Sequence, residues 1–448
     1  MDTTERLSET VRDLVESGRR ERLAQILEEA HSADIASVLR DLTVADQVTV
    51  FRLLTRDQAG AVLAELDDRT LSQLAQALDP AEISGMLDRL PTDDAAQVLE
   101  ELPAEQSEQV LDLMKEEKSE EVQELLEHGE KTAGRIMSPD VLSVHENLSV
   151  AQALDQVRKS PVAETAQALY VVDDHDHLVG SLPWRRLITA DAATPVGLLR
   201  QEEPVSVTPE TDQEEVARLV AKYDVVSIPV VDEDHHLIGT ISVDDVIDVI
   251  QEEHEEDVTA MVGSGAGELE RLSTSRRVFL RLPWLMITIV IQLVGGLIIA
   301  RFSKTISQVI LLVSFMPVIQ AISGNTGLQS ATIVVRGLAT GHMHLGKWRQ
   351  AVVQQLRTTL QLGLICGAVV GIVGALAHGT LTFGIVVGLS MLISINLSAI
   401  AGTGFPMLSK RLGFDPALTA GPFETAFQDV VGVTIYLGLA TLLIRFLL

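Results

Sequence analysis

Basic residues and cysteine are scarce in this sequence, and each shortage excludes a class of function. Its 34 lysines and arginines face 63 aspartates and glutamates, which gives a formal net charge of −29. A surface this acidic disfavours nucleic acid as a partner and suits small cations. The single cysteine, Cys366, excludes a disulfide within the chain.

Two kinds of motif are also missing. The chain has no glycine-rich phosphate-binding loop of the Walker type and no hydrolase or kinase motif, so we expect no enzymatic activity. Any bound ATP would therefore be regulatory. The first ten residues, MDTTERLSET, are polar and acidic, unlike a signal peptide, and we expect the soluble part to be cytoplasmic.

Charge and apolarity are separated along the 448 residues. The mean hydropathy is positive, +0.24, despite the charge, because most acids precede residue 275 and the long apolar runs follow it. We expect a multidomain protein with four parts. These are an all-α superhelical N domain (1–130), an α/β tandem pair (131–250), an acidic connecting helix (251–272) and a transmembrane domain of five helices (273–448).

A period of twelve residues runs through residues 31–126. Apolar residues recur at this spacing from Leu42 to Leu126, and a second series lies four residues earlier, from Val38 to Val122. Positions four apart share one face of a helix. Helix-start signals such as Asp79-Pro80, Pro91 and Pro103 separate the units. The pattern predicts one short helix and a turn per unit, stacked into a superhelix.

Residues 131–250 contain a duplication. A strand, a helix, two strands and a helix occur twice at a spacing of about sixty residues. The stretch IPVVDEDHHLIGTIS (228–242) resembles a CBS domain, so the region resembles a tandem CBS pair.

The second repeat carries a possible nucleotide site. In CBS pairs that bind adenosine nucleotides, Gly-x-x-Ser/Thr-x-x-Asp holds the ribose, and Gly239 to Asp245 match that pattern. The first repeat has Arg186 where the aspartate belongs, so at most one site is expected. A purely structural CBS pair is the alternative. The candidate nucleotide-binding residues are Gly239, Thr240, Ser242, Asp245 and Tyr170.

An acidic segment follows the second repeat. Five carboxylates lie within residues 252–257, where like charges weaken a helix unless cations neutralise them. Mg²⁺ prefers oxygen ligands. We expect Mg²⁺ to bridge these acids to acidic faces of the soluble domains, although a solvated charge run is the alternative. The candidate sensing residues are Asp93, Asp94, Asp244, Asp248, Glu252, Glu255, Glu256 and Asp257.

The apolar runs predict five membrane spans, at about 282–300, 307–323, 357–377, 381–402 and 420–445. The distribution of lysine and arginine places the N-terminus inside and the C-terminus outside. Phe315-Met316-Pro317 and Gly324-Asn325-Thr326-Gly327 at the end of the second span predict a broken helix. Its carbonyls and the side chains of Asn325 and Gln329 could then face hydrated ions.

Asp429 lies inside the last span, with no lysine or arginine near it in sequence. An aspartate at the bilayer centre costs roughly 2.5–3.5 kcal/mol on insertion scales, and such residues usually line an ion path. Asp429 is therefore a candidate ligand for a passing cation. A carboxylate that caps a helix or bonds within the bundle is the alternative.

Two stretches of the apolar region, together with the CBS pair, resemble the MgtE magnesium channels of bacteria. These stretches are Phe-x-Pro…Gly-Asn-Thr-Gly-x-Gln-Ser-Ala-Thr (315–332) and Asp-Pro-Ala…Gly-Pro…Asp-x-x-Gly (415–432). The resemblance implies a homodimer in the plasma membrane with a central pore that conducts Mg²⁺ inward and closes at high cytosolic Mg²⁺. It also implies that Asp429 is the main selectivity ligand, with the backbone near Thr425 contributing, and that residues 251–272 form a plug helix. Leu328, Gly421 and Glu424 depart from the family pattern.

Two other functions compete with a gated Mg²⁺ channel. One is a carrier that couples divalent efflux to Na⁺ or H⁺. The other is a membrane-anchored nucleotide sensor, which Asp429 and the polar second span argue against because an anchor needs neither.

Overall fold

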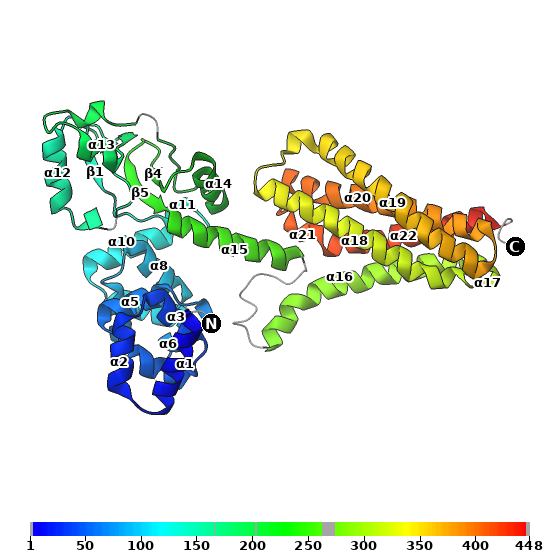
Figure 1. The fold of residues 1–448 in the computed structure, drawn as a ribbon, viewed down its shortest axis with the longest axis horizontal. Coiled ribbons are helices and arrows are strands. Elements are labelled where there is room, and N and C mark those ends of the chain that lie inside the picture. The colour runs from blue at the N-terminus through cyan, green and yellow to red at the C-terminus, as the bar shows by residue number, and fades with distance from the viewer. Residues whose placement is uncertain (1–2, 165, 202–203, 262–273, 445–448) are drawn as a thin grey trace. The chain divides into compact units, whose positions relative to one another are not determined.

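The fold is taken from a computed structural model, which describes residues 3–164, 166–201, 204–261 and 274–444 (Figure 1). Two compact units, Met1–Ile250 and Gln251–Leu448, make up the chain.

The first unit begins with an all-helical N domain, as the sequence predicts. From α3 onward its helices begin at residues 32, 44, 56, 68, 80, 92, 104 and 116, so the period of twelve is one helix per repeat. The helices are α1 (Thr3–Glu16), α2 (Arg20–Glu29), α3 (Ser32–Arg40), α4 (Val44–Phe51), α5 (Arg56–Ala64), α6 (Asp68–Ala75), α7 (Pro80–Leu87), α8 (Thr92–Glu101), α9 (Ala104–Leu113) and α10 (Glu116–Glu127).

The helix starts have the predicted chemistry. Asp79 caps α7 in a reciprocal capping box with Glu82, and Pro80 occupies the first helical position. Pro91 and Pro103 directly precede α8 and α9. Such signals end each helix after two to three turns, which lets the next one stack against it.

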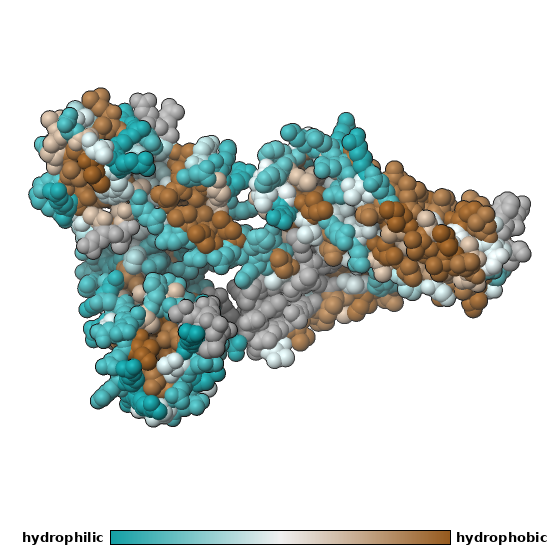
Figure 2. Space-filling model, in the orientation of Figure 1, coloured by the Kyte–Doolittle hydropathy of each residue, from teal (hydrophilic) through white to brown (hydrophobic). Residues whose placement is uncertain are grey.

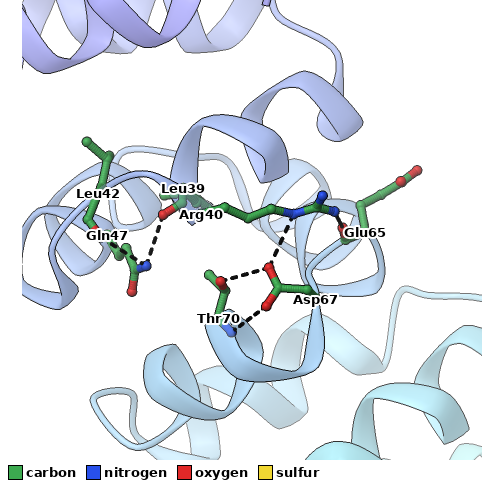
Figure 3. A network of polar contacts seen from close by, with 7 residues as sticks. All are labelled: Leu39, Arg40, Leu42, Gln47, Glu65, Asp67 and Thr70. Atoms are coloured by element: carbon green, nitrogen blue, oxygen red, sulfur yellow. Dashed lines mark hydrogen bonds and ion pairs between the residues drawn. The ribbon is translucent and has the colours of Figure 1, made fainter. Parts of the chain in front are cut away.

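Polar contacts tie successive repeats together near α3 to α6 (Figure 3). The Asp67 carboxylate caps α6 by accepting hydrogen bonds from the backbone N–H and hydroxyl of Thr70, at 3.0 and 2.8 Å. Its Oδ2 also pairs with Arg40 of α3 at 3.2 Å. Buried Gln47 donates to the Leu39 carbonyl at 2.9 Å, closing the turn between α3 and α4.

The CBS pair follows. In the first repeat β1 (Ser143–His145) pairs parallel to β2 (Tyr170–Val172), which pairs antiparallel to β3 (Leu178–Ser181). In the second, β4 (Ser227–Val231) pairs antiparallel to β5 (Leu237–Ser242), and a bridge from Val207 to Val230 takes the place of the expected first strand. The helices are α11 (Ala133–Ile136), α12 (Val150–Lys159), α13 (Trp184–Thr189) and α14 (Gln213–Tyr223).

One hydrophobic core joins the N domain to the second CBS repeat. It runs from Val11 through Val122 and Met137 to Ile241 and Val249, whereas the first repeat has its own core around Val144, Val171 and Leu187. The second repeat and the N domain therefore pack together, and this brings α8 close to β5.

Helix α15 (Val243–Met261) carries the acidic segment, and it is continuous with the second CBS repeat in sequence, as predicted. Residues 262–273 of the predicted connecting helix lie outside the described residues.

The second unit is helical. Three helices are long and apolar enough to cross a membrane, over Leu345–His378, Leu381–Arg411 and Phe423–Leu442, and Leu285–Arg301 is a shorter apolar helix. Figure 2 shows the apolar surface gathered over these helices. The helices are α16 (Thr274–Arg301), α17 (Ser303–Gln308), α18 (Leu312–Ala339), α19 (Trp348–His378), α20 (Leu381–Arg411), α21 (Ala417–Ala420) and α22 (Pro422–Leu442).

The prediction of a broken helix at 315–327 is wrong. Helix α18 is continuous from Leu312 to Ala339 with Pro317 inside it, so the second apolar helix does not end at residue 323. The hydroxyls of Ser323, Thr326 and Ser330 donate to carbonyls four residues earlier, at 2.5–2.9 Å, and are satisfied within the helix. The backbone carbonyls near Gly327 are consequently helical rather than free to face an ion.

Gly327 and Gly402 serve close packing instead. A Cβ added to Gly402 would lie 2.2 Å from the Gly327 carbonyl oxygen, so α18 and α20 meet backbone to backbone. Gly363, Gly367 and Gly371 of α19 likewise pack against α20, as is typical of small-residue ridges between membrane helices.

Candidate functional site

An acidic cavity of about 180 Å³ lies between α8 and the second CBS repeat. The carboxylates that line it come from distant parts of the sequence. Asp93 and Asp94 are in the first turn of α8, Asp244 and Asp245 are in the first turn of α15, and Asp140 precedes β1. The fold thus brings four of the predicted acidic residues together, Asp93, Asp94, Asp244 and Asp245.

The crowding changes how these acids titrate. Burial, with the charges of Asp93, Asp245, Asp244 and Glu65, raises the pKa of Asp94 to about 7. Burial also raises the pKa of Asp245 to about 6, assisted by Asp93 and Asp244. The raised pKa values mean that Asp94 and Asp245 bind protons near neutral pH, and a divalent cation could take the place of those protons.

The hydrogen bonds in the cavity are made by neutral donors. Ser242 donates through its backbone N–H, at 3.1 Å, and its hydroxyl, at 2.5 Å, to Asp245, and the hydroxyl also contacts Asp244. Gln167 donates to Asp244 at 3.1 Å, and Ser138 donates to Asp93 at 3.3 Å. The described residues that line the cavity include no lysine or arginine, so none of them balances its negative charge.

Tyr170 and Gly239 do not line this cavity. The Tyr170 ring is 2% exposed, and its hydroxyl bonds to those of Ser227 and Thr240 at 2.8 and 3.1 Å. A Cβ at Gly239 would lie 2.6 Å from the Met137 sulfur, so a side chain here would require Met137 to move. Thr240 and Ser242 do line the cavity, with Asp245.

Asp248 lies one turn after Asp244 on α15, and its pKa is raised by partial burial and by Glu65 and Asp244. Its side chain is exposed, as are those of Glu252 and Glu255 farther along the helix.

The end of α15 forms a separate acidic group in the second unit. Burial, with the charges of Asp415, Glu253 and Glu256, raises the pKa of Asp257 to about 6. Ala260 packs nearby with Ala331 and Val335 of α18 and with Ala417 and Ala420 of α21. The end of α15 that carries Asp257 therefore packs against α18 and α21.

In the membrane helices Asp429 is half-buried on α22, and its carboxylate accepts a hydrogen bond from the side-chain amide of Gln292 on α16. Thr425, one turn earlier on the same face, is exposed in the single chain and donates to the Gly421 carbonyl at 3.1 Å. Asn325 and Gln329, also one turn apart, are exposed on α18. All four predicted pore residues thus lie outside the core of the single chain.

A second carboxylate of α22, Glu424, is fully buried. Its Oε1 accepts a hydrogen bond from Ser398 of α20 at 2.6 Å, in space that Gly327 leaves by having no side chain. Gln428, one turn later, is also buried and donates to Ser323 of α18 at 2.5 Å. The two faces of α22 therefore differ, because Glu424 and Gln428 are buried and bond to α20 and α18, whereas Asp429 is half-buried beside α16 and Thr425 is exposed.

Comparisons with known proteins cover most of the chain. The family model described as a divalent cation transporter, MgtE, matches residues 316–439, and the MgtE intracellular N domain matches residues 30–131. CBS domains match 133–193 and 198–252. The chain is 38% identical over 323 residues to the magnesium transporter MgtE of Thermus thermophilus, covering 70% of this chain and 71% of the relative. The chain belongs to the MgtE family.

The MgtE transporter of Bacillus subtilis is 33% identical over 315 residues, covering 70% of each chain. The solved cytosolic domain of the Mg²⁺ channel MgtE in complex with ATP is 34% identical, with a TM-score of 0.52, and spans 54% of this chain and 99% of that one. The soluble part of a magnesium transporter matches at 27% identity and a TM-score of 0.51, covering 56% of this chain and 99% of that one.

Family membership fixes the coarse function. The chain is a membrane protein of a magnesium transporter family, with a helical N domain, a CBS pair and a helical C-terminal region. Sequence reasoning missed the polar contacts between helices, Gln292 to Asp429 and Ser398 to Glu424. The departure of Glu424 from the MgtE pattern was the only signal that pointed to one of them.

Proposed function

We propose that this protein is a Mg²⁺ channel of the plasma membrane. In this account a homodimer conducts Mg²⁺ inward through a central pore, with the N-terminus in the cytoplasm and the C-terminus outside. Five helices of each chain form the membrane domain. Mg²⁺ bound to the acidic cytosolic region closes the pore.

Asp429 is the observation that carries the pore proposal. It is a half-buried carboxylate within a helix that is apolar enough to span a membrane, and its described polar partner is the neutral amide of Gln292. A two-fold axis beside α22 would place a second Asp429 opposite the first. Two carboxylates facing one axis suit a hydrated divalent cation, since Mg²⁺ binds proteins through one or two carboxylates and keeps several waters.

Thr425, Asn325 and Gln329 complete the proposed pore lining. Each is polar and exposed in the single chain. A polar side chain at membrane depth needs a polar neighbour or water. Because α18 is unbroken, Asn325 and Gln329 would contribute their side-chain amides rather than backbone carbonyls.

The acidic cavity supports the sensing role. Asp93, Asp94, Asp244 and Asp245 converge there. Burial opposes the ionisation of Asp93, Asp94 and Asp245 and so raises the pKa of each. Mg²⁺ would favour the compact arrangement of each acidic group by binding at this cavity and at the acids of α15. Those acids are Asp248, Glu252, Glu255, Glu256 and Asp257. The population shift is set by how much more tightly the ions bind that arrangement.

ATP is proposed as a regulatory ligand of the CBS pair. A related cytosolic domain has been solved with ATP. Here Asp245, with Ser242 and Thr240, would contact the ribose. Tyr170 and Gly239 would instead support the packing behind these three residues. The observed cavity is small beside the roughly 300–1,000 Å³ of typical ligand sites, so ATP would have to widen it.

A carrier that couples divalent transport to Na⁺ or H⁺ is the second candidate. The buried Glu424 favours it, because its Oε2 has no hydrogen-bond partner among the described residues and an enclosed carboxylate can hold a monovalent cation. Patch recordings separate the two: a channel gives unitary Mg²⁺ currents that do not need a Na⁺ or proton gradient, whereas a carrier gives gradient-dependent flux without unitary currents.

A further inference from the structure

A buried polar cluster lies where α18, α20 and α22 meet, on a different face of α22 from Asp429. It has two layers, one helical turn apart. In the first layer Glu424 accepts its hydrogen bond from Ser398 of α20. In the second layer Gln428 donates to Ser323 of α18. These four side chains are at most 1% exposed, so a single chain encloses them.

The cluster holds oxygen atoms that make no hydrogen bond. Five buried side-chain atoms have no hydrogen-bond partner among the described residues, and three of them belong to this cluster. They are Oε2 of Glu424, Oε1 of Gln428 and Oγ of Ser394. Buried polar atoms are paired in most native structures. Three such oxygens on two adjoining helices therefore indicate a ligand that binds lone pairs.

The orientation of Gln428 is set by its neighbours. The Ser323 hydroxyl donates to the Ile319 carbonyl, so toward Gln428 its oxygen acts as an acceptor and faces the amide nitrogen. That nitrogen also lies 2.9 Å from the place a Cβ would take at Gly432. The amide oxygen consequently points away from Gly432, and Glu424 is the next residue of this face in that direction.

Ser394 supplies a hydroxyl from α20. The buried hydroxyls of Ser390 and Thr403 on the same helix donate to carbonyls four residues earlier at 2.7 Å, whereas that of Ser394 does not. Its Oγ lies 3.9 Å from the place a Cβ would take at Gly432, so it faces α22 next to Gln428. A hydroxyl that is not bonded back to its own helix can direct a lone pair at an ion.

The charge of the cluster suits a monovalent cation. Glu424 lies in the first turn of α22, where the partial positive charge of the helix N-terminus favours the ionised carboxylate. Buried charges in proteins are normally paired or coordinate a metal ion. One carboxylate balances one monovalent charge. Mg²⁺, in contrast, usually keeps several waters, which helices packed backbone to backbone at Gly327 and Gly402 would exclude.

We propose that Glu424, Gln428 and Ser394 bind one dehydrated Na⁺ within each chain. Ser398 holds the other carboxylate oxygen and so directs Oε2 at the ion. The ion links α20 to α22, and the close packing of these helices favours Na⁺ over the larger K⁺. The site goes beyond the proposed channel and does not depend on it, because the ion lies between helices of one chain and not beside Asp429.

The test is thermal unfolding of the full-length protein in detergent with EDTA. Sodium, potassium and N-methyl-D-glucamine chlorides are compared at equal ionic strength. Wild type should gain a few degrees in Tm in the sodium salt only, because a ligand that binds the folded state stabilises it. Glu424→Gln keeps the size and the contact with Ser398 but should lose this gain.

A matched pair of serine variants provides the control. Ser394→Ala should raise the Na⁺ concentration at half effect by about tenfold, since a contact with a charged group is lost. Ser390→Ala removes a buried hydroxyl one turn earlier that is already bonded within α20, and it should keep the wild-type response. Equal Na⁺ responses in these two variants would overturn the proposal, even if Glu424→Gln failed to fold.

Infrared difference spectra of wild type and Glu424→Gln give a readout that does not depend on stability. In the sodium salt we expect the wild type to show an ionised carboxylate that the variant lacks. A protonated carboxyl band instead would overturn the proposal, because a proton would then neutralise Glu424. Equal Tm values of wild type in the sodium and potassium salts, or a Na⁺ gain retained by Glu424→Gln, would overturn it as well.

Discussion

The acidic cavity and the outer face of α22 place carboxylates in opposite circumstances. In the cavity several acids crowd one another, and burial holds protons on Asp94 and Asp245 close to neutral pH. On α22 a single carboxylate, Asp429, lies beside a neutral amide. The cavity brings several carboxylates together within one chain. In the proposed pore, by contrast, the second carboxylate would come from another copy of the chain. In the proposed account, sensing would be a property of each chain, whereas conduction would be a property of the dimer.

The largest expected effect is at Asp429. Asp429→Ala should abolish Mg²⁺ uptake by proteoliposomes while the dimer still assembles, because the proposed pore then loses both of its carboxylates. Asp429→Asn, which keeps the size and the contact with Gln292, should also lose most uptake if charge is what matters. Thr434→Val, an exposed position on the same helix, is the control. Wild-type uptake in Asp429→Ala would show that this residue is not an ion ligand.

Mg²⁺ should protect the acidic connector from proteolysis. If the ions hold the acidic segment of α15 in one arrangement, cleavage between Glu252 and Ser275 should slow at least severalfold when EDTA is replaced by millimolar Mg²⁺. The triple variant Glu255→Ala, Glu256→Ala, Asp257→Ala should lose this protection. Identical cleavage of wild type in EDTA and in Mg²⁺ would mean that the segment is a solvated charge run.

The cavity also predicts a pH dependence of stability. Asp94 has a folded-state pKa of about 7 against an ordinary value of 3.8, so the folded protein binds more protons than the unfolded one between these values. In EDTA, stability should therefore fall as the pH rises from about 4 through about 7, with Asp245 contributing up to about 6.

Mg²⁺ should restore the stability that is lost at high pH, because the bound ion takes the place of the protons on the cavity carboxylates. At tenfold its Kd, Mg²⁺ should add about 1.4 kcal/mol to the free energy of unfolding. The gain should be larger at pH 8 than at pH 6, and thermal unfolding of wild type and of Asp94→Asn checks it. An equal Mg²⁺ effect at both pH values, or one retained in Asp94→Asn, would place the binding site elsewhere.

The smallest expected effect concerns ATP. Asp245→Ala should weaken ATP binding about tenfold, since a hydrogen bond to a charged group contributes roughly 1.5–3 kcal/mol. Asp248→Ala, an exposed acid one turn away, should change it little. Calorimetry on the full-length protein measures both. Unchanged affinity in Asp245→Ala, or no binding by wild type, would reject this nucleotide site.

Local signals were enough to predict the soluble fold. Caps such as Asp79 and prolines such as Pro91 act within one turn of the chain, so the helix starts could be located from sequence. The break at Pro317 could not be judged in this way. Whether α18 is continuous depends on the contact of Gly327 with Gly402 of the neighbouring helix. It also depends on serine hydroxyls that donate to backbone carbonyls of α18 itself.

The candidate sites were predictable in part. The acids of α8 and α15 were chosen for their charge, and the fold places Asp93, Asp94, Asp244 and Asp245 around one cavity. The unpartnered oxygens of Glu424, Gln428 and Ser394 could not be predicted in this way, because they depend on the packing of three helices.

The most direct test of the whole account is a recording of Mg²⁺ current from excised membrane patches while cytosolic Mg²⁺ is raised through the millimolar range. We expect the wild-type open probability to fall steeply, and we expect the triple alanine variant at Glu255, Glu256 and Asp257 to stay open. Wild-type currents that do not change with cytosolic Mg²⁺, or a triple variant that closes at lower Mg²⁺ than wild type, would contradict gating by ions bound to these acids.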